Sequence, residues 1–120
     1  MGSRAQLKVV SEEFDTPIFL YTHWGSFDLN ETLAEGLERS RPRWGDAEYA
    51  TRILFNTLTK GDEEGETGYG IGTSEHGDLD YPAVEVNLDD RKVRYRRFDQ
   101  DLKEIGFEDF ITDKPNFIGD

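Results

Sequence analysis

The sequence predicts an α+β domain: an antiparallel sheet of about four to five strands, with two main helices packed on one face and a short C-terminal helix. Three patterns carry this prediction. Two neighbouring segments in the middle of the chain have apolar residues at helical spacing, and short β-type segments stand before and after them. Near residue 90, two segments of alternating apolar and polar residues surround a turn, which is typical of a hairpin. Such an order favours an antiparallel sheet covered by helices on one side.

Two strands are expected near the beginning of the chain. Residues 6–10 form a short candidate strand, and residues 18–24 form a second one after the break at Thr16 and Pro17. The second segment alternates only weakly, which indicates that both of its faces are covered. We expect a single domain over residues 1–120, in which residues 1–4 are disordered or derived from a tag.

The first helix is predicted to begin at a capping residue, Asp28 or Asn30, and to run to about Arg39. Gly36 lies inside it and weakens it by ~1 kcal/mol relative to alanine. The apolar residues of this helix repeat at helical spacing and are Leu29, Leu33, Ala34 and Leu37.

The second helix is predicted to begin after the capping residue Asp46 and to end at Leu58 or Lys60. Tyr49 and Phe55 broaden its apolar face. The residues that define this face are Ala50, Ile53, Leu54, Thr57 and Leu58.

A glycine-rich strand is expected over residues 67–73, between flexible loops at 61–66 and 74–80. The hairpin that follows joins residues 83–88 to residues 91–97. Its polar face brings Glu85 and Asn87 opposite arginines of the second strand, Arg94 or Arg96. Residues 98–110 resemble a short polar helix or turn segment. We expect Phe107, Phe110 and Ile111 to attach the C-terminal part of the chain to the core.

The balance of charge restricts the class of partner. Acidic residues outnumber basic residues by 26 to 14, and the formal net charge is −12 at pH 7. A surface this negative repels nucleic-acid backbones and anionic membranes, so neither is expected as a partner. Three explanations of the charge stay open: complementarity to a basic protein surface, adaptation to high salt, and ordinary acidic drift. Among partners, a second copy of the chain in a homo-oligomer is also possible, with the basic hairpin of one copy against an acidic patch of the other.

Several kinds of chemistry lack the residues they need. The chain has no cysteine, and His23 and His76 do not stand at a metal-ligand spacing. The acidic run 62–66 lacks the ligand order of a calcium loop, and Gly68, Gly70 and Gly72 do not form a dinucleotide-binding fingerprint. We therefore expect no metal and no cofactor. No apolar run approaches the roughly 18 residues of a membrane span, and a cytoplasmic location is expected.

Two hypotheses of function follow, and the first is a noncatalytic protein-binding module. Aromatic side chains would make its specific contacts, because large rings dominate the energetics of interfaces. The candidate binding residues are Trp24, Trp44, Tyr49 and Tyr69.

The second hypothesis is a small-molecule binder or small enzyme with a pocket between the second helix and the strand ends. His23 would be the general base and Arg52 the anchor for an anion, while Thr67 and the Gly68 amide would orient the ligand beside Glu66. This hypothesis requires His23, Arg52, Glu66 and Thr67 to surround one cavity. A catalytic role is the less favoured of the two.

Blocks of the sequence over residues 17–97 resemble a family of small uncharacterised proteins of tailed viruses and proviruses of actinobacteria and archaea. The resemblance implies an accessory protein that acts on host machinery in the host cytoplasm, and with this acidic composition it implies a haloarchaeal host. The family brings no known fold or activity. The blocks are residues 21–24, 43–46, 49, 52–55 and 65–71.

Overall fold

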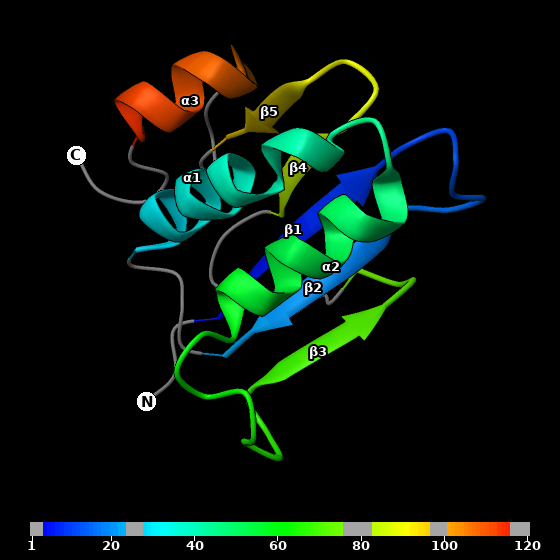
Figure 1. Ribbon diagram of the computed structural model, residues 1–120, viewed down its shortest axis with the longest axis vertical. Coiled ribbons are helices and arrows are strands. Elements are labelled where there is room, and N and C mark those ends of the chain that lie inside the picture. The colour runs from blue at the N-terminus through cyan, green and yellow to red at the C-terminus, as the bar shows by residue number, and fades with distance from the viewer. Residues whose placement is uncertain (1–3, 24–27, 76–82, 97–100, 116–120) are drawn as a thin grey trace.

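The computed structural model describes residues 4–23, 28–75, 83–96 and 101–115. These residues form six strands, three α-helices and one 3-10 turn (Figure 1). The strands are β1 (Ala5–Val10), β2 (Ile18–Thr22), β3 (Tyr69–Gly72), β4 (Val84–Asn87), β5 (Lys92–Tyr95) and β6 (Lys103–Gly106). The helices are α1 (Leu29–Ser40), α2 (Ala47–Leu58) and α3 (Phe107–Asp113), with η1 (Arg41–Arg43) between α1 and α2.

The α+β class is confirmed, but the sheet is larger than expected and is mixed. Its order is β3-β2-β1-β4-β5-β6, and β1 pairs with β4 in parallel, whereas the other neighbours are antiparallel. The prediction of a purely antiparallel sheet is therefore wrong at its centre. The parallel pair joins strands that are separated by two helices and two other strands, so no local pattern reveals it.

The two long helices lie on one face of the sheet, and α3 packs beside α1 (Figure 1). Leu7 of β1 lies between Leu20 of β2 and Val84 of β4 in the strand register, and Val86 lies opposite Val93. These side chains are buried under the helices because alternate residues of a strand point to the same face. The core therefore fills the layer between the sheet and the pair α1 and α2.

Both predicted helices are present within two residues of the expected ends. Asp28 and Asp46 occupy the N-cap positions, but in the described part of the chain neither side chain makes a capping hydrogen bond. Trp44 connects the helices to the C-terminal part. Its indole Nε1–H donates to the carbonyl oxygen of Leu37 at 3.1 Å, and its ring packs edge-to-face on Phe107, with centroids 5.0 Å apart.

The C-terminal part differs from its prediction. The sequence predicts a helix or turn over residues 98–110, whereas the described part of this stretch contains the strand β6, followed directly by α3. Only Ile105 gives β6 an apolar residue, so the sequence lacks the alternation of a half-buried strand. The expected attachment is confirmed, because Phe107 and Phe110 are buried and Ile111 packs against the core.

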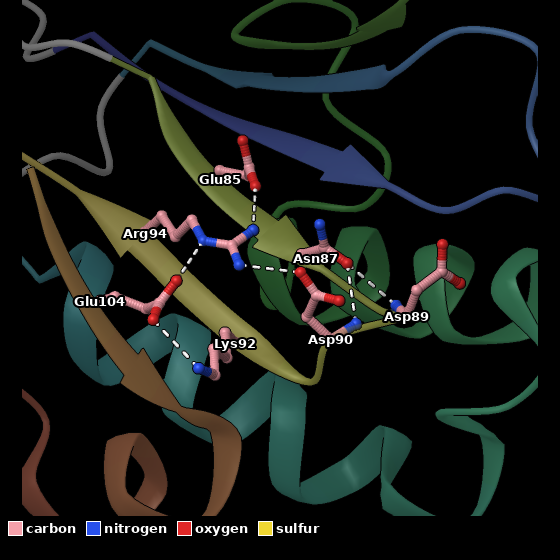
Figure 2. Close-up of polar contacts among 7 residues, drawn as sticks. All are labelled: Glu85, Asn87, Asp89, Asp90, Lys92, Arg94 and Glu104. Atoms are coloured by element: carbon pink, nitrogen blue, oxygen red, sulfur yellow. Dashed lines mark hydrogen bonds and ion pairs between the residues drawn. The ribbon is translucent and has the colours of Figure 1, made fainter.

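On the sheet face away from the helices, the Arg94 side chain of β5 contacts residues of both neighbouring strands, β4 and β6 (Figure 2). Its guanidinium donates to Glu85 of β4 at 2.9 Å, to Asp90 of the hairpin turn at 2.8 Å and to Glu104 of β6. The predicted pairing of Glu85 with Arg94 is confirmed. Lys92 also contacts Glu104, at 3.0 Å. Carboxylates of the same sheet thus neutralise Lys92 and Arg94, two members of the basic cluster in the hairpin.

Candidate functional site

An apolar groove opens between α2 and the β3 edge of the sheet. Its volume is about 290 Å³. Strands β2 and β3 form one wall, α2 forms the other, and the β1–β2 loop closes one end. The lining residues are Phe14, Ile18, Leu20, Glu48, Thr51, Arg52, Phe55 and Ile71.

The periodicities of strand and helix bring these side chains to one place. Ile18 and Leu20 are two residues apart on β2 and therefore point to the same face, and Ile71 lies opposite Leu20 in the antiparallel register. Thr51 and Phe55 are four residues apart on α2, so they share a helix face. An apolar strand surface and an apolar helix surface thus face each other across the groove.

Ile71 makes this groove unusual for a surface feature. Its side chain is 62 % exposed, although β3 pairs with β2 beside the core. β3 is the terminal strand of the sheet, and no strand in the described part of the chain pairs with its outer edge. A terminal strand presents N–H and C=O groups that can hydrogen-bond an added strand. The groove therefore combines an exposed apolar residue with the edge of a sheet.

Thr51 places a polar group in the groove wall. The residue is 9 % exposed, and its Oγ1 has no hydrogen-bond partner among the described residues. A threonine in a helix ordinarily bonds the carbonyl four residues earlier, as Thr57 does with Ile53 at 2.8 Å. A buried hydroxyl without a partner costs free energy, so Thr51 makes this part of the groove wall less stable than an apolar side chain would.

Exposed acidic residues adjoin the segments that form the groove and stand before and after β3. Among the described residues of the lining, Arg52 is the only basic one, and it lies one turn after Glu48 on α2. Backbone hydrogen bonds at Glu63 and Gly61 lower the pKa of Glu63 in the loop before β3. The exposed acidic residues are Glu12, Glu13 and Asp15 in the β1–β2 loop, Glu48 on α2, residues 62–64 and 66 before β3, and Glu75 after it.

His23 lies at the end of β2, where β2 meets the start of β3. Its backbone N–H donates to the Gly68 carbonyl oxygen at 2.8 Å, and its Nδ1 lies 3.1 Å from the Tyr21 hydroxyl. Tyr21 pairs with Gly70 on the sheet face away from the helices. The structure thus brings His23 and Gly68 together through the backbone.

Arg52, Glu66 and Thr67 are not themselves part of this backbone contact, although Thr67 directly precedes Gly68 in the chain. Arg52 lines the apolar groove, whereas Glu66 and Thr67 are exposed in the loop before β3. Among the described residues, the lining of the groove does not include His23, Glu66 or Thr67. No single described cavity is lined by all four residues.

The predicted aromatic contact residues have different environments. Trp44 is buried in the core, with the guanidinium of Arg41 5.1 Å from its ring centroid. Tyr49 is half exposed on α2, with Arg43 5.1 Å from its ring. Tyr69 is partly buried and lines a polar cavity of about 310 Å³ between α1, the end of α2 and the strands β2 and β3. Trp24 and His76 lie outside the described residues.

Sequence reasoning placed Arg52 at a pocket beside the second helix, but it missed the apolar residues that line the groove. Phe14 and Ile71 each stand among polar or glycine neighbours, where neither periodic pattern singles them out. The available signal is the wide apolar face of α2, which includes Phe55. A helix with such a wide face requires more cover than a single neighbouring helix provides.

Two further properties concern the described residues. They include no helix that is both long and apolar enough to cross a bilayer. They also include no group of three or more histidine, aspartate or glutamate side chains arranged to hold a metal ion.

The chain matches no family model, no curated protein and no solved structure in comparisons with known proteins.

Proposed function

We propose that the protein is a noncatalytic binding module that captures a basic, extended segment of a partner protein along β3. One observation carries this proposal: an apolar groove opens directly beside the terminal strand of the sheet, and exposed acidic residues adjoin the segments that form both. Binding at this place needs no catalytic group.

The backbone of β3 supplies the mode of binding. A partner segment that adds as a seventh strand would hydrogen-bond N–H and C=O groups of the outer edge. Every second side chain of that segment would point to the helix side of the sheet, beside Ile71. The groove would then accept one apolar side chain of the partner.

Apolar contact supplies part of the affinity. Complete burial of an isoleucine side chain contributes about 1.5–3 kcal/mol, and an apolar residue of the partner in the groove contributes a similar amount. Ile71 is 62 % exposed, so most of its contribution is still available to a partner. Loss of translational and rotational freedom opposes these gains, and the backbone hydrogen bonds of an added strand help to offset it.

Charge favours a basic partner over a second copy of this chain. The net charge is −12, and acidic residues stand before and after β3 and beside Phe14. Two copies joined through their β3 edges would bring these carboxylates together, which is repulsive. Lysine or arginine residues on both sides of an apolar residue would instead be attracted.

The resemblance to viral and proviral proteins gives this proposal a setting. In that setting the module is an accessory protein in the host cytoplasm, and the partner is a host protein with a basic surface. The resemblance supports the setting only, whereas the groove supports the mode of contact.

Fluorescence anisotropy with labelled eight-residue peptides tests the proposal. The probe alternates leucine with lysine, and the comparison peptide alternates leucine with glutamate. We expect saturable binding of the lysine peptide and at least about tenfold weaker binding by Ile71→Asp. Leu102→Asp is the matched control, because Leu102 is also 62 % exposed but does not line the groove. Equal binding by both variants, or by both peptides, would contradict the proposal.

A further inference from the structure

A second cavity, separate from the groove, lies between α1, the end of α2 and the strands β2 and β3. Its volume is about 310 Å³, which is within the range of small-molecule sites. Four elements or their ends contribute to its wall. The lining residues are Thr22, Asp28, Thr32, Glu35, Thr57, Leu58, Lys60 and Tyr69.

Two of these residues place hydroxyl groups in the layer between the sheet and the helices, where the neighbouring side chains are apolar. Thr22 is 1 % exposed and lies opposite Ala5 on the helix-facing side of β2, in line with Leu20. Thr57 is 4 % exposed and follows Leu54 on the buried face of α2. Polar side chains in a core layer cost free energy unless their hydrogen bonds are made. Exceptions to the binary pattern of a core often mark functional sites.

The hydrogen bonds of Thr57 show what its hydroxyl can still do. The hydroxyl donates to the Ile53 carbonyl oxygen at 2.8 Å and accepts from Arg39 Nη1 at 2.9 Å. A hydroxyl has one proton and two lone pairs. The proton and one lone pair are therefore used, and the second lone pair can accept a hydrogen bond from a ligand.

The charged groups of the wall are mostly acceptors. Lys60 Nζ lies 2.9 Å from Glu35 Oε2, so this ammonium group is already neutralised. The carboxylate of Asp28 adds a further negative charge to the wall. Asp28 and Glu35 balance Lys60 and the Arg39 guanidinium behind Thr57, so the wall offers an anion no excess of positive charge, whereas hydroxyl groups of a neutral ligand would find acceptors.

Tyr69 and Leu58 give the cavity an apolar part. Burial, and then the charge of Asp62 and a hydrogen bond to it, raise the pKa of Tyr69. The ring and the Leu58 side chain can pack against C–H groups of a ligand. We infer that this cavity binds a small, uncharged, polyhydroxylated molecule of monosaccharide size through its threonine hydroxyls and acidic rim.

Ligand-detected NMR with D-glucose, D-ribose and myo-inositol tests this inference. We expect saturable binding of at least one of them at concentrations up to about 50 mM, since very small ligands bind weakly. Thr22→Val and Thr57→Val keep the side-chain shape but remove a hydroxyl, and each should weaken binding by about tenfold or more. Thr112→Val is the matched control, because Thr112 is exposed on α3 and does not line the cavity.

Thermal unfolding of each variant shows whether it is folded. The inference is overturned if the folded wild-type protein binds none of the three molecules, if both cavity variants bind as well as the control, or if glucose 6-phosphate or a simple amine binds more tightly than the neutral molecules. Ile71→Asp should keep this binding, so the outcome is independent of the proposed peptide site.

Discussion

Leu54 of α2 packs against the bare backbone of Gly36 on α1. A Cβ atom added to Gly36 would lie 2.8 Å from Leu54 Cδ2, which is too close for two carbon atoms. The glycine that weakens α1 as a helix is therefore what allows α1 and α2 to approach each other.

Gly36→Ala should destabilise the protein, although alanine is the better helix former. The gain in helix propensity is ~1 kcal/mol, and overpacking costs about 1–3 kcal/mol, so we expect a net loss of about 1 kcal/mol. Urea unfolding measures the difference. Gly72→Ala is the control, because a Cβ atom added there would meet no atom within 4 Å. A more stable Gly36→Ala protein would show that the Leu54 side chain or the helices can shift at little cost.

Arg94→Lys should weaken the C-terminal half of the sheet. The guanidinium contacts Glu85, Asp90 and Glu104 at once, and an ammonium group lacks the planar set of donors needed to replace these three contacts. Exposed ion pairs contribute only about 0.2–1 kcal/mol each, so we expect a small loss of stability. Hydrogen exchange of β5 and β6 amides should rise more than that of β1 and β2. Uniform exchange rates would contradict a local role.

The ion pairs of Glu104 predict a pH dependence. Hydrogen bonds from Arg94 and then from Lys92 lower the pKa of Glu104 below its usual value. A carboxyl group with a lowered pKa in the folded state contributes stability above its unfolded pKa, and this contribution is lost as the pH falls through the lowered value. The wild-type protein should therefore be more stable than Glu104→Gln at pH 7, and the difference should vanish in strong acid. Urea unfolding at several pH values measures it, and a difference that grows with acidity would have the wrong sign.

Local patterns in the sequence predict most of the helical structure. The stripe from Leu29 to Leu37 and the wide face of α2 follow from spacing alone, since each is set within one segment. The pairing of β1 with β4 is different, because its partners are more than seventy residues apart. The sequence does not predict β6, because its residues lack an alternating pattern. Pairing with β5 holds this segment in the strand conformation.

The sites are harder to predict than the fold. The groove joins Phe14, Phe55 and Ile71, which no motif connects in the sequence. Residue types alone favour histidine and arginine as site residues. The walls of the described cavities instead contain threonines, which stand out only because they are buried. Nothing in the sequence around Thr22 and Thr57 marks them as site residues. They become candidates only because the fold buries their side chains in the core layer.

Thr51→Val and Thr57→Val should have opposite effects on stability, although both change the same residue type on α2. The Thr51 hydroxyl has no partner in the described part of the chain, so its removal should stabilise the protein by about 1 kcal/mol. The Thr57 hydroxyl has two partners, and its removal should cost about 1 kcal/mol. Urea unfolding compares the two. Stabilisation by neither variant would show that the Thr51 hydroxyl is satisfied in solution.

Salt should separate two of the explanations of the negative charge. If the charge serves a basic partner, the protein is folded at low salt, and the lysine peptide binds less tightly as KCl rises. The affinity should then level off in multimolar KCl, because contact with Ile71 and the groove does not depend on charge. Circular dichroism and anisotropy on the same samples measure both properties. Unfolding at low KCl would indicate that the carboxylates serve salt adaptation. Repulsion among them would then exceed the stabilisation that the hydrophobic core provides.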